Sequence, residues 1–232
     1  MAERRKAAPA HAEMALRRAV VEAAKAMSRE ALSPGRSGNV SARLPGGILI
    51  TPTGLPYESL APEQIVLVRD DGSSPPGALL PSSELALHRA VYEARPEAGA
   101  VVHCHSLNAT ALACAGKPIP AFHYMVAVAG GADIPLAPYA AFGTPSLAAA
   151  VAATLRHRRA CLLAHHGQIA CGPDLASALD LARDVEVLAA QYIKTLQIGG
   201  GPILDEAAMS EVMDRFRTYG QQEAPAKKRR TQ

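Results

Sequence analysis

Four residues of this chain have the types and local settings of a metal site: Glu84, His103, His105 and His166. Three imidazoles and one carboxylate form a ligand set that suits Zn²⁺, a borderline-soft cation. His103 and His105 stand in the apolar segment 100–105, which reads as a buried strand. Since residues two apart on a strand point to the same face, both imidazoles can meet one ion, while Cys104 points the other way.

The other two candidate ligands stand at the ends of predicted elements. His166 closes a second apolar run over 160–166, and Glu84 opens a predicted helix directly after Ser82 and Ser83. For any one of the histidines, a core imidazole satisfied by hydrogen bonds is the alternative interpretation. Taken together, the four residues predict a zinc centre assembled from separate parts of the chain.

Three further segments have the composition of anion-binding sites: residues 37–41, residues 51–54, and the serine pair at 82–83. Small hydroxyl and amide side chains beside glycine let backbone N–H groups approach an oxyanion, and the start of a helix leaves N–H groups free to bind one. These segments match neither a Walker loop nor a G-x-G-x-x-G fingerprint. Each alone also fits an ordinary turn, but beside a metal site the three predict a bound phosphate group.

The composition fits a single domain of 232 residues, 49% of them hydrophobic. The 24 basic and 21 acidic residues leave a net charge of +3, which is too balanced to indicate nucleic-acid binding. No apolar run reaches the ~18 residues that span a bilayer, and the basic N-terminus lacks the apolar core of a signal peptide. The four cysteines show no C-x-x-C spacing and read as reduced thiols, so we expect a cytoplasmic protein that binds neither membranes nor nucleic acid.

Apolar periodicity and turn residues predict a mixture of helices and strands. Helices are expected over 12–32, 82–94, 107–115, 144–157, 174–197 and 205–219. Strands are expected over 39–44, 47–51, 65–68 and 100–105, with two more in 160–171 that turn at Gly167 and Gln168. Periodicity alone therefore indicates an α/β protein, with residues 1–11 as a flexible leader, 12–220 as one domain and 221–232 as a basic tail.

In their order, eight motifs of the chain resemble those of the class II aldolase and adducin family, most closely its branch of L-fuculose-1-phosphate aldolases. The motifs are S-G-N-V-S (37–41), I-T-P-T-G-L-P-Y (50–57), L-P-S-S-E (80–84), V-V-H-C-H (101–105), F-H-Y-M (122–125), A-P-Y-A-A-F-G-T (137–144), H-H-G (165–167) and F-R-T-Y-G (216–220). The likeness covers roughly residues 12–220. It implies a three-layer α/β/α domain with a largely antiparallel central sheet, in a fourfold-symmetric homotetramer with shared active sites.

The resemblance also implies roles for individual residues. The zinc ligands of the family match Glu84, His103, His105 and His166. The residues that bind the substrate phosphate match Gly38, Asn39, Thr53, Gly54, Ser82 and Ser83. Tyr124 matches a catalytic tyrosine that reaches the site of the neighbouring subunit, and Tyr219 matches one from the C-terminal region. From the residues alone, a packed aromatic side chain is the favoured interpretation of Tyr124, and a tyrosine near the end of a helix, such as Tyr219, is often packing as well.

These roles imply cleavage of a ketose 1-phosphate, such as L-fuculose 1-phosphate, to dihydroxyacetone phosphate and a small aldehyde such as L-lactaldehyde. A Lewis-acid cation at the ketone oxygen would stabilise the charge left when the C3–C4 bond breaks, without a lysine Schiff base. Glu84 would carry the proton of the nucleophilic carbon, and Tyr124 would donate a proton to the aldehyde oxygen. Phe142 and Phe216 would form an apolar wall for the aldehyde.

Other functions stay open on the same fold. A pentulose-phosphate 4-epimerase or a methylthioribulose-1-phosphate dehydratase would share the metal chemistry, although the epimerase branch typically lacks the H-Y-M pattern of residues 123–125. A non-catalytic adducin-like interaction module would need no metal ligands, and the full ligand set present here argues against it. A 5-deoxy or 5-methylthio pentulose phosphate would use the same metal and phosphate residues as L-fuculose 1-phosphate.

Overall fold

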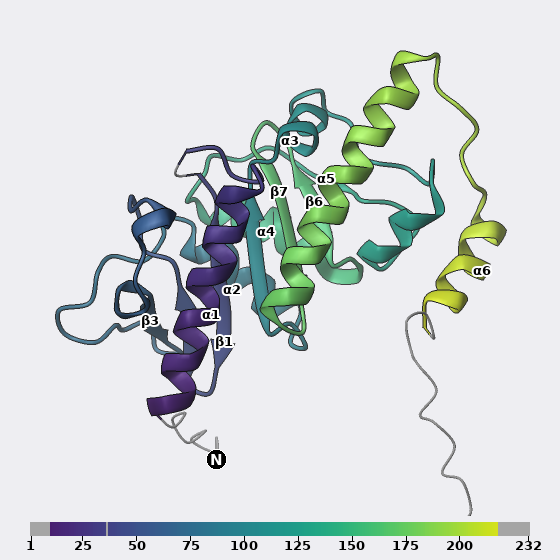
Figure 1. Cartoon of the computed structure of the whole chain (residues 1–232). Helices are drawn as coiled ribbons and strands as arrows, with labels where there is room; N and C mark the ends of the chain where they lie inside the picture. Colours follow the sequence, from purple (N-terminus) through teal and green to yellow (C-terminus); the bar gives the residue numbers. More distant parts are fainter. Residues whose placement is uncertain (1–9, 36, 218–232) are drawn as a thin grey trace, which may run out of the picture.

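A central sheet organises the computed structural model, which describes residues 10–35 and 37–217 (Figure 1). Its strands are β1 (Asn39–Leu44), β2 (Gly47–Ile50), β3 (Val66–Arg69), β4 (Ala100–Cys104), β5 (Leu136–Ala137), β6 (Ala160–Leu163) and β7 (Gly167–Gly172). They lie in the order β3-β2-β1-β4-β7-β6-β5. Every neighbouring pair is antiparallel except β5 and β6, which are parallel. The predicted α/β fold with a largely antiparallel sheet is confirmed.

Helices cover both faces of the sheet and complete the three layers. The α-helices are α1 (Ala10–Arg29), α2 (Leu85–Ala94), α3 (Leu107–Cys114), α4 (Pro145–Thr154), α5 (Leu175–Gln197) and α6 (Glu206–Phe216). Short 3-10 helices lie at η1 (Tyr57–Ser59), η2 (Pro62–Gln64), η3 (Tyr124–Ala129) and η4 (Leu155–His157). Helices α1, α3 and α5 pack on one face, α2 and α4 pack together on the other, and α6 packs beside η3 (Figure 1).

Strand alternation divides the hydrophobic core into two clusters, one on each side of the sheet. On β4, Val102 and Cys104 belong to the cluster under α1 and α5, whereas Val101 belongs to the cluster under α2 and α4. Because side chains two apart share a face, His103 points to the same side as Val101. The prediction that Cys104 points away from the metal ligands is therefore confirmed.

The first predicted helix ends earlier than its apolar pattern indicated. Helix α1 stops at Arg29, because Ala31 adopts a left-handed φ of 57°. The N–H of Leu32 then donates to the carbonyl oxygen of Met27 at 3.0 Å, which closes the helix end as a Schellman motif does. Leu32 is still buried, so the apolar periodicity continues past the last helical residue.

The predicted turn between the last two strands is misplaced. Strands β6 and β7 are joined by residues 164–166, not by Gly167 and Gln168, because His165 takes the left-handed φ of 56°. Gly167 instead lies within β7, where a side chain would meet the Cys104 carbonyl oxygen at 2.5 Å. A glycine inside a strand often marks such a close backbone approach. The shift places His166 in the turn rather than at the end of a strand.

Several sequence predictions fall outside the described residues. Most of the predicted leader, all of the tail at 221–232, and Tyr219 lie there, so the domain boundaries at 12 and 220 stay predictions. The last predicted helix is present as α6, which ends at Phe216. In the described part of the chain, every helix is too short or too polar to cross a membrane.

Candidate metal centre

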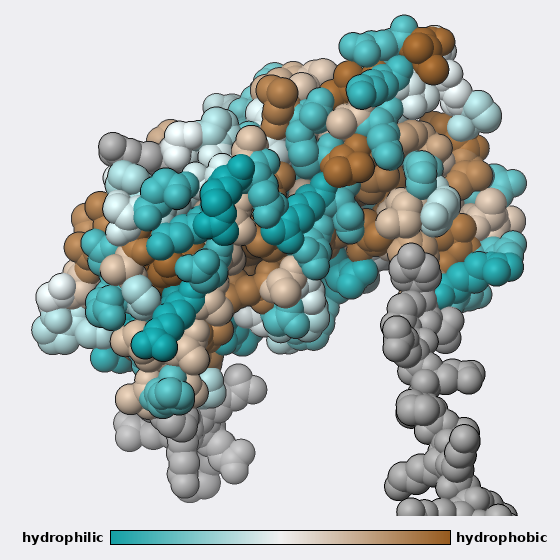
Figure 2. Space-filling view, in the orientation of Figure 1, coloured by the Kyte–Doolittle hydropathy of each residue, from teal (hydrophilic) through white to brown (hydrophobic). Residues whose placement is uncertain are grey.

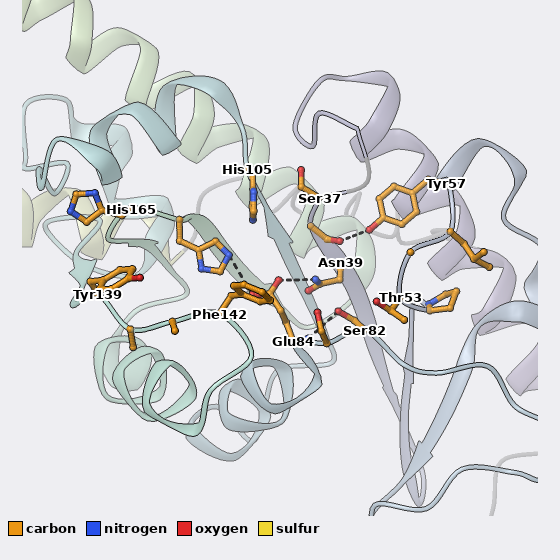
Figure 3. A pocket seen from close by; sticks show the side chains of 18 residues that line it. Ser37, Asn39, Thr53, Tyr57, Ser82, Glu84, His105, Tyr139, Phe142 and His165 are labelled. Carbon is orange, nitrogen blue, oxygen red and sulfur yellow. Dashed lines mark hydrogen bonds and ion pairs between the residues drawn. The ribbon is translucent and has the colours of Figure 1, made fainter.

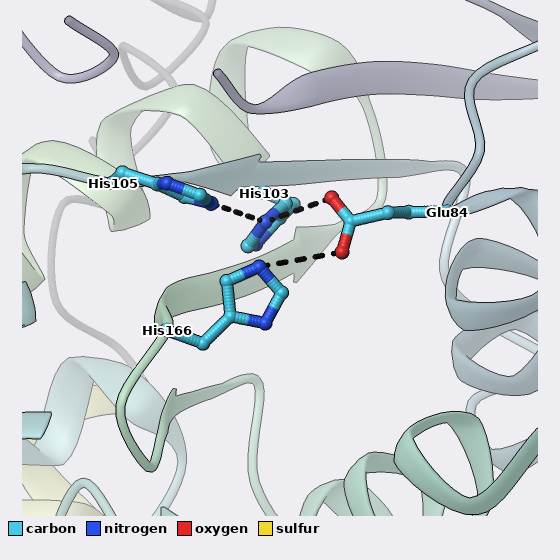
Figure 4. Close-up of side chains that lie close together, drawn as sticks. All are labelled: Glu84, His103, His105 and His166. Carbon is cyan, nitrogen blue, oxygen red and sulfur yellow. Dashed lines mark hydrogen bonds and ion pairs between the residues drawn. The ribbon is translucent and has the colours of Figure 1, made fainter. Parts of the chain in front are cut away.

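The four predicted ligands come together from three places in the fold (Figure 4). Strand β4 carries His103 and leads directly to His105, and the turn between β6 and β7 carries His166. Because β7 pairs with β4, the turn at its start lies beside the end of β4. Glu84 is the N-cap residue of α2 and reaches the same point from the other side.

The ligand atoms of these residues all lie within 4.8 Å of one another. The Nε2 atom of His103 lies 3.0 Å from Nε2 of His105 and 3.1 Å from Oε2 of Glu84. The Nε2 atom of His166 lies 3.3 Å from Oε1 of Glu84. Three imidazole nitrogens and one carboxylate therefore converge on one small volume, as a divalent cation requires.

Hydrogen bonding and burial prepare the imidazoles to act as ligands. His103 Nδ1 lies 2.8 Å from the carbonyl oxygen of Gln168, which only accepts, so a neutral His103 carries its proton on Nδ1 and directs the Nε2 lone pair into the cluster. Burial lowers the pKa of His105 to about 4 and that of His166 to about 4. Both imidazoles are thus neutral at neutral pH, the form that binds metals.

The Glu84 carboxylate supplies a direct test of whether this cluster fits a cation. Burial by itself raises the pKa of Glu84, but the His103 imidazole, the Asn39 amide and the His166 imidazole together hold it well below its usual range. Its buried Oε1 faces His166 and has no hydrogen-bond partner among the described residues. An ionised, buried oxygen without a donor is costly, and a bound cation among these nitrogens would satisfy it. The residues present therefore fit a divalent metal.

A cavity of about 440 Å³ opens beside this cluster (Figure 3). Its walls include three of the candidate ligands, Glu84, His105 and His166, while His103 is completely buried behind them. All of the predicted phosphate-binding residues line the same cavity: Gly38, Asn39, Thr53, Gly54, Ser82 and Ser83. The candidate metal ligands and the segments predicted to bind phosphate thus lie at the same cavity.

Backbone hydrogen bonds bring two of the phosphate segments side by side. The Thr53 N–H donates to the Leu80 carbonyl oxygen at 3.1 Å, and the Ser82 N–H donates to the Thr51 carbonyl oxygen at 3.0 Å. An isolated antiparallel bridge forms between them, in the middle of both loops. This pairing places the start of α2 beside the loop that follows β2, so that both loops face the cavity together.

Gly38 lets the segment 37–41 lie directly against β4, the strand that carries His103. A side chain at Gly38 would meet Ser33 Oγ at 2.4 Å and the His103 carbonyl oxygen at 2.6 Å, and its φ of 81° is one that other residues rarely adopt. Its own carbonyl oxygen accepts a hydrogen bond from the Tyr57 hydroxyl (Figure 3). The loop before β1 can approach the cluster only with glycine at this position.

Asn39 lies at the cavity as predicted, but its side chain is already engaged. Its Nδ2 donates to Oε2 of Glu84 at 3.0 Å, and its Oδ1 lies 2.5 Å from Nε2 of His88. The predicted contact between this amide and a phosphate therefore competes with a contact to the candidate metal ligand. The role of Asn39 as a phosphate ligand stays a prediction.

Two predicted aromatic residues do not line the cavity within one chain. Tyr124 lies on η3, is half exposed and stacks on His123 with ring centroids 4.8 Å apart. Phe216 packs against the core beside η3, whereas Phe142 does line the cavity and is 72% exposed. Of the predicted apolar wall, one chain therefore supplies only Phe142.

Sequence reasoning did not assign several residues that the cavity contains. Tyr57, Tyr139 and His165 line it, and burial raises the pKa of Tyr57 to about 12, so that its hydroxyl keeps its proton. All three stand inside the motifs at 50–57, 137–144 and 165–167, which was the available signal. A motif names neighbours in sequence, but it does not say which of them face the cavity.

Comparisons with known proteins show what the whole chain is similar to. The family model of the class II aldolase and adducin N-terminal domain matches residues 18–193. An L-fuculose phosphate aldolase of Escherichia coli is 48% identical over 206 residues, which cover 88% of this chain and 95% of that protein. A 5-methylthioribulose-1-phosphate/5-deoxyribulose-1-phosphate aldolase of Rhodospirillum rubrum is 47% identical over 207 residues, 89% of this chain and 93% of that protein.

A solved structure of an L-fuculose 1-phosphate aldolase superposes with a TM-score of 0.85 at 32% identity, covering 91% of this chain and 98% of that one. The match to the family model spans the strands and turns that carry the candidate metal ligands. The chain therefore belongs to the class II aldolase and adducin family, and it is an enzyme of the aldolase kind.

Proposed function

We propose that this enzyme is a zinc-dependent aldolase that reversibly cleaves a ketose 1-phosphate to dihydroxyacetone phosphate and a small aldehyde. The observation that supports the proposal is the shared cavity, which brings the candidate metal ligands beside the three segments predicted to bind phosphate. In a ketose 1-phosphate the ester oxygen of the phosphate is two bonds from the ketone carbon, so the ketone and the phosphate would both fit such a site at once. Three imidazoles and one carboxylate favour Zn²⁺ over harder cations.

In this proposal, Glu84, His103, His105 and His166 hold the cation. The cation supplies Lewis-acid polarisation of the substrate ketone, which stabilises the negative charge that develops as the C3–C4 bond breaks. Glu84 would also exchange the proton of the nucleophilic carbon through Oε1, once substrate oxygens take the place of that oxygen at the cation. Tyr57, held protonated beside Gly38, keeps the phosphate loop in place against the strand that carries the ligands.

The substrate phosphate would bind among Gly38, Asn39, Thr53, Gly54, Ser82 and Ser83. Ser82 Oγ accepts a hydrogen bond from the Glu84 N–H at 3.2 Å, which leaves its hydroxyl proton available to a phosphate oxygen. Ser83 is exposed in the cavity wall and offers a second hydroxyl. Because the start of α2 also favours anions, this side of the cavity suits a phosphate.

The relatives support a choice among the open activities. Those compared are named as aldolases of L-fuculose phosphate or of 5-methylthioribulose 1-phosphate and 5-deoxyribulose 1-phosphate. We therefore favour aldol cleavage over epimerisation or dehydration, with L-fuculose 1-phosphate or a similar deoxy-ketose 1-phosphate as substrate. The exposed ring of Phe142 offers the apolar end of such an aldehyde a surface in the cavity.

We further propose a cytoplasmic homotetramer in which Tyr124 and Tyr219 complete the active site, with Tyr124 serving a neighbouring subunit. Tyr124 is half exposed on η3, clear of its own cavity. Hydrophobic side chains gather near the C-terminal end of α5 and the segment that follows it, including Ile198 and Ile203 (Figure 2). Such apolar surface supports contacts between subunits. The four free cysteines fit a reducing compartment.

The test is a retro-aldol assay on purified, zinc-loaded protein with a panel of substrates. L-fuculose 1-phosphate, 5-deoxyribulose 1-phosphate and 5-methylthioribulose 1-phosphate would be compared with their unphosphorylated forms. Dihydroxyacetone phosphate is measured by a coupled reduction, and the aldehyde is identified by mass spectrometry. We expect cleavage of at least one phosphate ester and little cleavage of the free sugars. Inversion at C4 or loss of water without dihydroxyacetone phosphate would overturn the proposal.

A further inference from the structure

A buried row of polar side chains runs from the candidate metal ligand Glu84 into the space between β1 and α2. From it we propose that His88 is a positioning residue, which orients the Asn39 amide and, through that amide, the Glu84 carboxylate. Asn39 and Glu84 belong to the site already described, whereas His88 lies outside the cavity, and its imidazole bonds to Ser41 and Asn39. The inference rests on the proposed function only where it concerns turnover.

The row is a continuous chain of hydrogen bonds. The Tyr92 hydroxyl lies 2.8 Å from Ser41 Oγ, and Ser41 Oγ lies 2.6 Å from His88 Nδ1. On the other side of the ring, His88 Nε2 lies 2.5 Å from Asn39 Oδ1, and Asn39 Nδ2 donates to Glu84 Oε2 at 3.0 Å. All five side chains are buried, and His88 and Ser41 are completely so.

The donor and acceptor of each hydrogen bond in this row follow from the Glu84 carboxylate at its end. The Glu84 carboxylate only accepts, so Asn39 must present its NH₂ group to it and turn Oδ1 toward His88. Oδ1 also only accepts, so the donor must be the Nε2–H of His88. In the neutral imidazole Nδ1 then accepts from the Ser41 hydroxyl, and Ser41 Oγ accepts from Tyr92.

Burial keeps the imidazole in the form that this direction requires. His88 is completely buried, and a charged imidazole there would be costly, so the ring is neutral. A neutral ring has one donor nitrogen and one acceptor nitrogen. His88 therefore holds Asn39 in one of its two amide orientations.

The orientation of Asn39 decides what Glu84 meets. With the NH₂ group facing Oε2, the carboxylate is held on one side, and its other oxygen, Oε1, stays free to face His166. If the amide turned over, its oxygen would face the carboxylate, and two acceptors would repel each other. Without the His88 donor, the buried Oδ1 of Asn39 loses its partner, so the amide can turn away from Glu84, and the carboxylate loses its fixed place among the imidazoles.

The row also has a simple origin in sequence spacing. Glu84, His88 and Tyr92 are four residues apart along α2, so they lie on one side of the helix. Asn39 and Ser41 are two apart on β1, so they face that side of the sheet together. Apolar residues at these positions would pack the same interface, so the polar set is not needed for packing alone.

Two substitutions of similar size separate positioning from packing. His88→Gln keeps a terminal amide that can reach Asn39 Oδ1 as a donor, whereas His88→Asn is too short to reach it and keeps only the contact with Ser41. Zinc affinity is measured by competition with a chelator, without any substrate. Loss of a group that orients a ligand usually costs 10–100-fold in metal affinity, so we expect about that loss in His88→Asn and at most a few-fold loss in His88→Gln.

Turnover and a matched control complete the design. Val91→Ala, in the same helix and the same buried layer but outside the row, should destabilise the fold while leaving zinc affinity and kcat/KM unchanged. If His88 acts through Asn39, His88→Asn should cost little more in an Asn39→Ala background, so that the two losses in zinc affinity are not additive. Additive losses, or equal losses in both His88 variants, would overturn the proposal.

One measurement needs no variant at all. Long-range ¹⁵N–¹H spectra of the intact protein should show His88 protonated on Nε2 and unprotonated on Nδ1 from mildly acidic to neutral pH. Protonation on Nδ1 would overturn the proposal even if His88→Asn failed to fold. The zinc-affinity measurements and the spectra use no sugar phosphate. A protein that cleaves none of the substrate panel would therefore refute the proposed function, while these two measurements would still test the role of His88.

Discussion

The sharpest test of the site is Glu84→Gln, which removes the proposed base and leaves its shape. The structure predicts how the new amide would lie. Its oxygen would take the place of Oε2, because Asn39 donates there at 3.0 Å, and its NH₂ group would take the place of Oε1 near His166. The substitution therefore keeps the contact with Asn39 and removes the one free oxygen that can accept a proton.

The size of the effect follows from the role assigned to that oxygen. A positioned general base contributes about 10²–10⁴-fold, which corresponds to about 2.7–5.4 kcal/mol in the barrier to proton transfer. Zinc should be largely retained, because the imidazoles of His103, His105 and His166 remain in place. The variant should therefore bind metal and substrate but remove the carbon-bound proton slowly.

The assay follows exchange of the C3 proton of dihydroxyacetone phosphate with deuterated water by ¹H NMR, without any aldehyde. Omitting the aldehyde isolates the proton transfer from carbon–carbon bond cleavage. Glu97→Gln is a suitable control, because Glu97 is exposed and pairs with Arg95 at 2.6 Å, away from the cavity. Exchange at the wild-type rate in zinc-loaded Glu84→Gln would refute the assignment of Glu84 as the base.

Three further predictions concern the metal, the phosphate and the assembly. Elemental analysis should find about one Zn²⁺ per chain; chelation should abolish activity and zinc or cobalt should restore it, and a fully active metal-free protein would rule this out. Ser83→Ala should raise KM for the phosphorylated substrate by removing a hydrogen bond worth ~1.5–3 kcal/mol, with zinc content unchanged; Asn39→Ala should do the same but also weaken zinc binding, because its amide holds Glu84. Tyr124→Phe should slow cleavage yet spare C3 exchange, and mixing it with Glu84→Gln should recover activity once mass spectrometry shows mixed oligomers; mixed oligomers without recovery would contradict a shared site.

Much of the site could be predicted from local patterns. The alternation of a strand places His103 and His105 on one face with Cys104 opposite, and the structure has that arrangement. The serine pair before an apolar periodic segment likewise predicted that a helix starts at Glu84, and in the structure α2 begins directly after it. These inferences succeed because the geometry of a strand or a helix start depends on the backbone of a few consecutive residues.

Other features depended on residues far apart in the chain, and the local pattern misled there. The turn before β7 was predicted at Gly167, yet His165 takes the left-handed conformation. Gly167 instead permits a close approach to the backbone of Cys104. His88 falls within the helix predicted over 82–94, and nothing in that pattern indicated that both ring nitrogens bond to residues of β1. A spacing rule gives the face of a helix, but it does not give the partner that lies across from it.

The sequence by itself determined the family, the α/β class and the ligand types, because periodicity and ordered motifs record which residues share a face or a turn. Only the tertiary structure decided how three segments meet around one cavity and that the Asn39 amide bonds to Glu84 rather than standing free for a phosphate. The physical reason is that these contacts are set by strand pairing and by the bridge between Pro52 and Pro81. Such pairings join residues dozens of positions apart, and a buried polar group takes whichever partner the fold places within hydrogen-bonding distance.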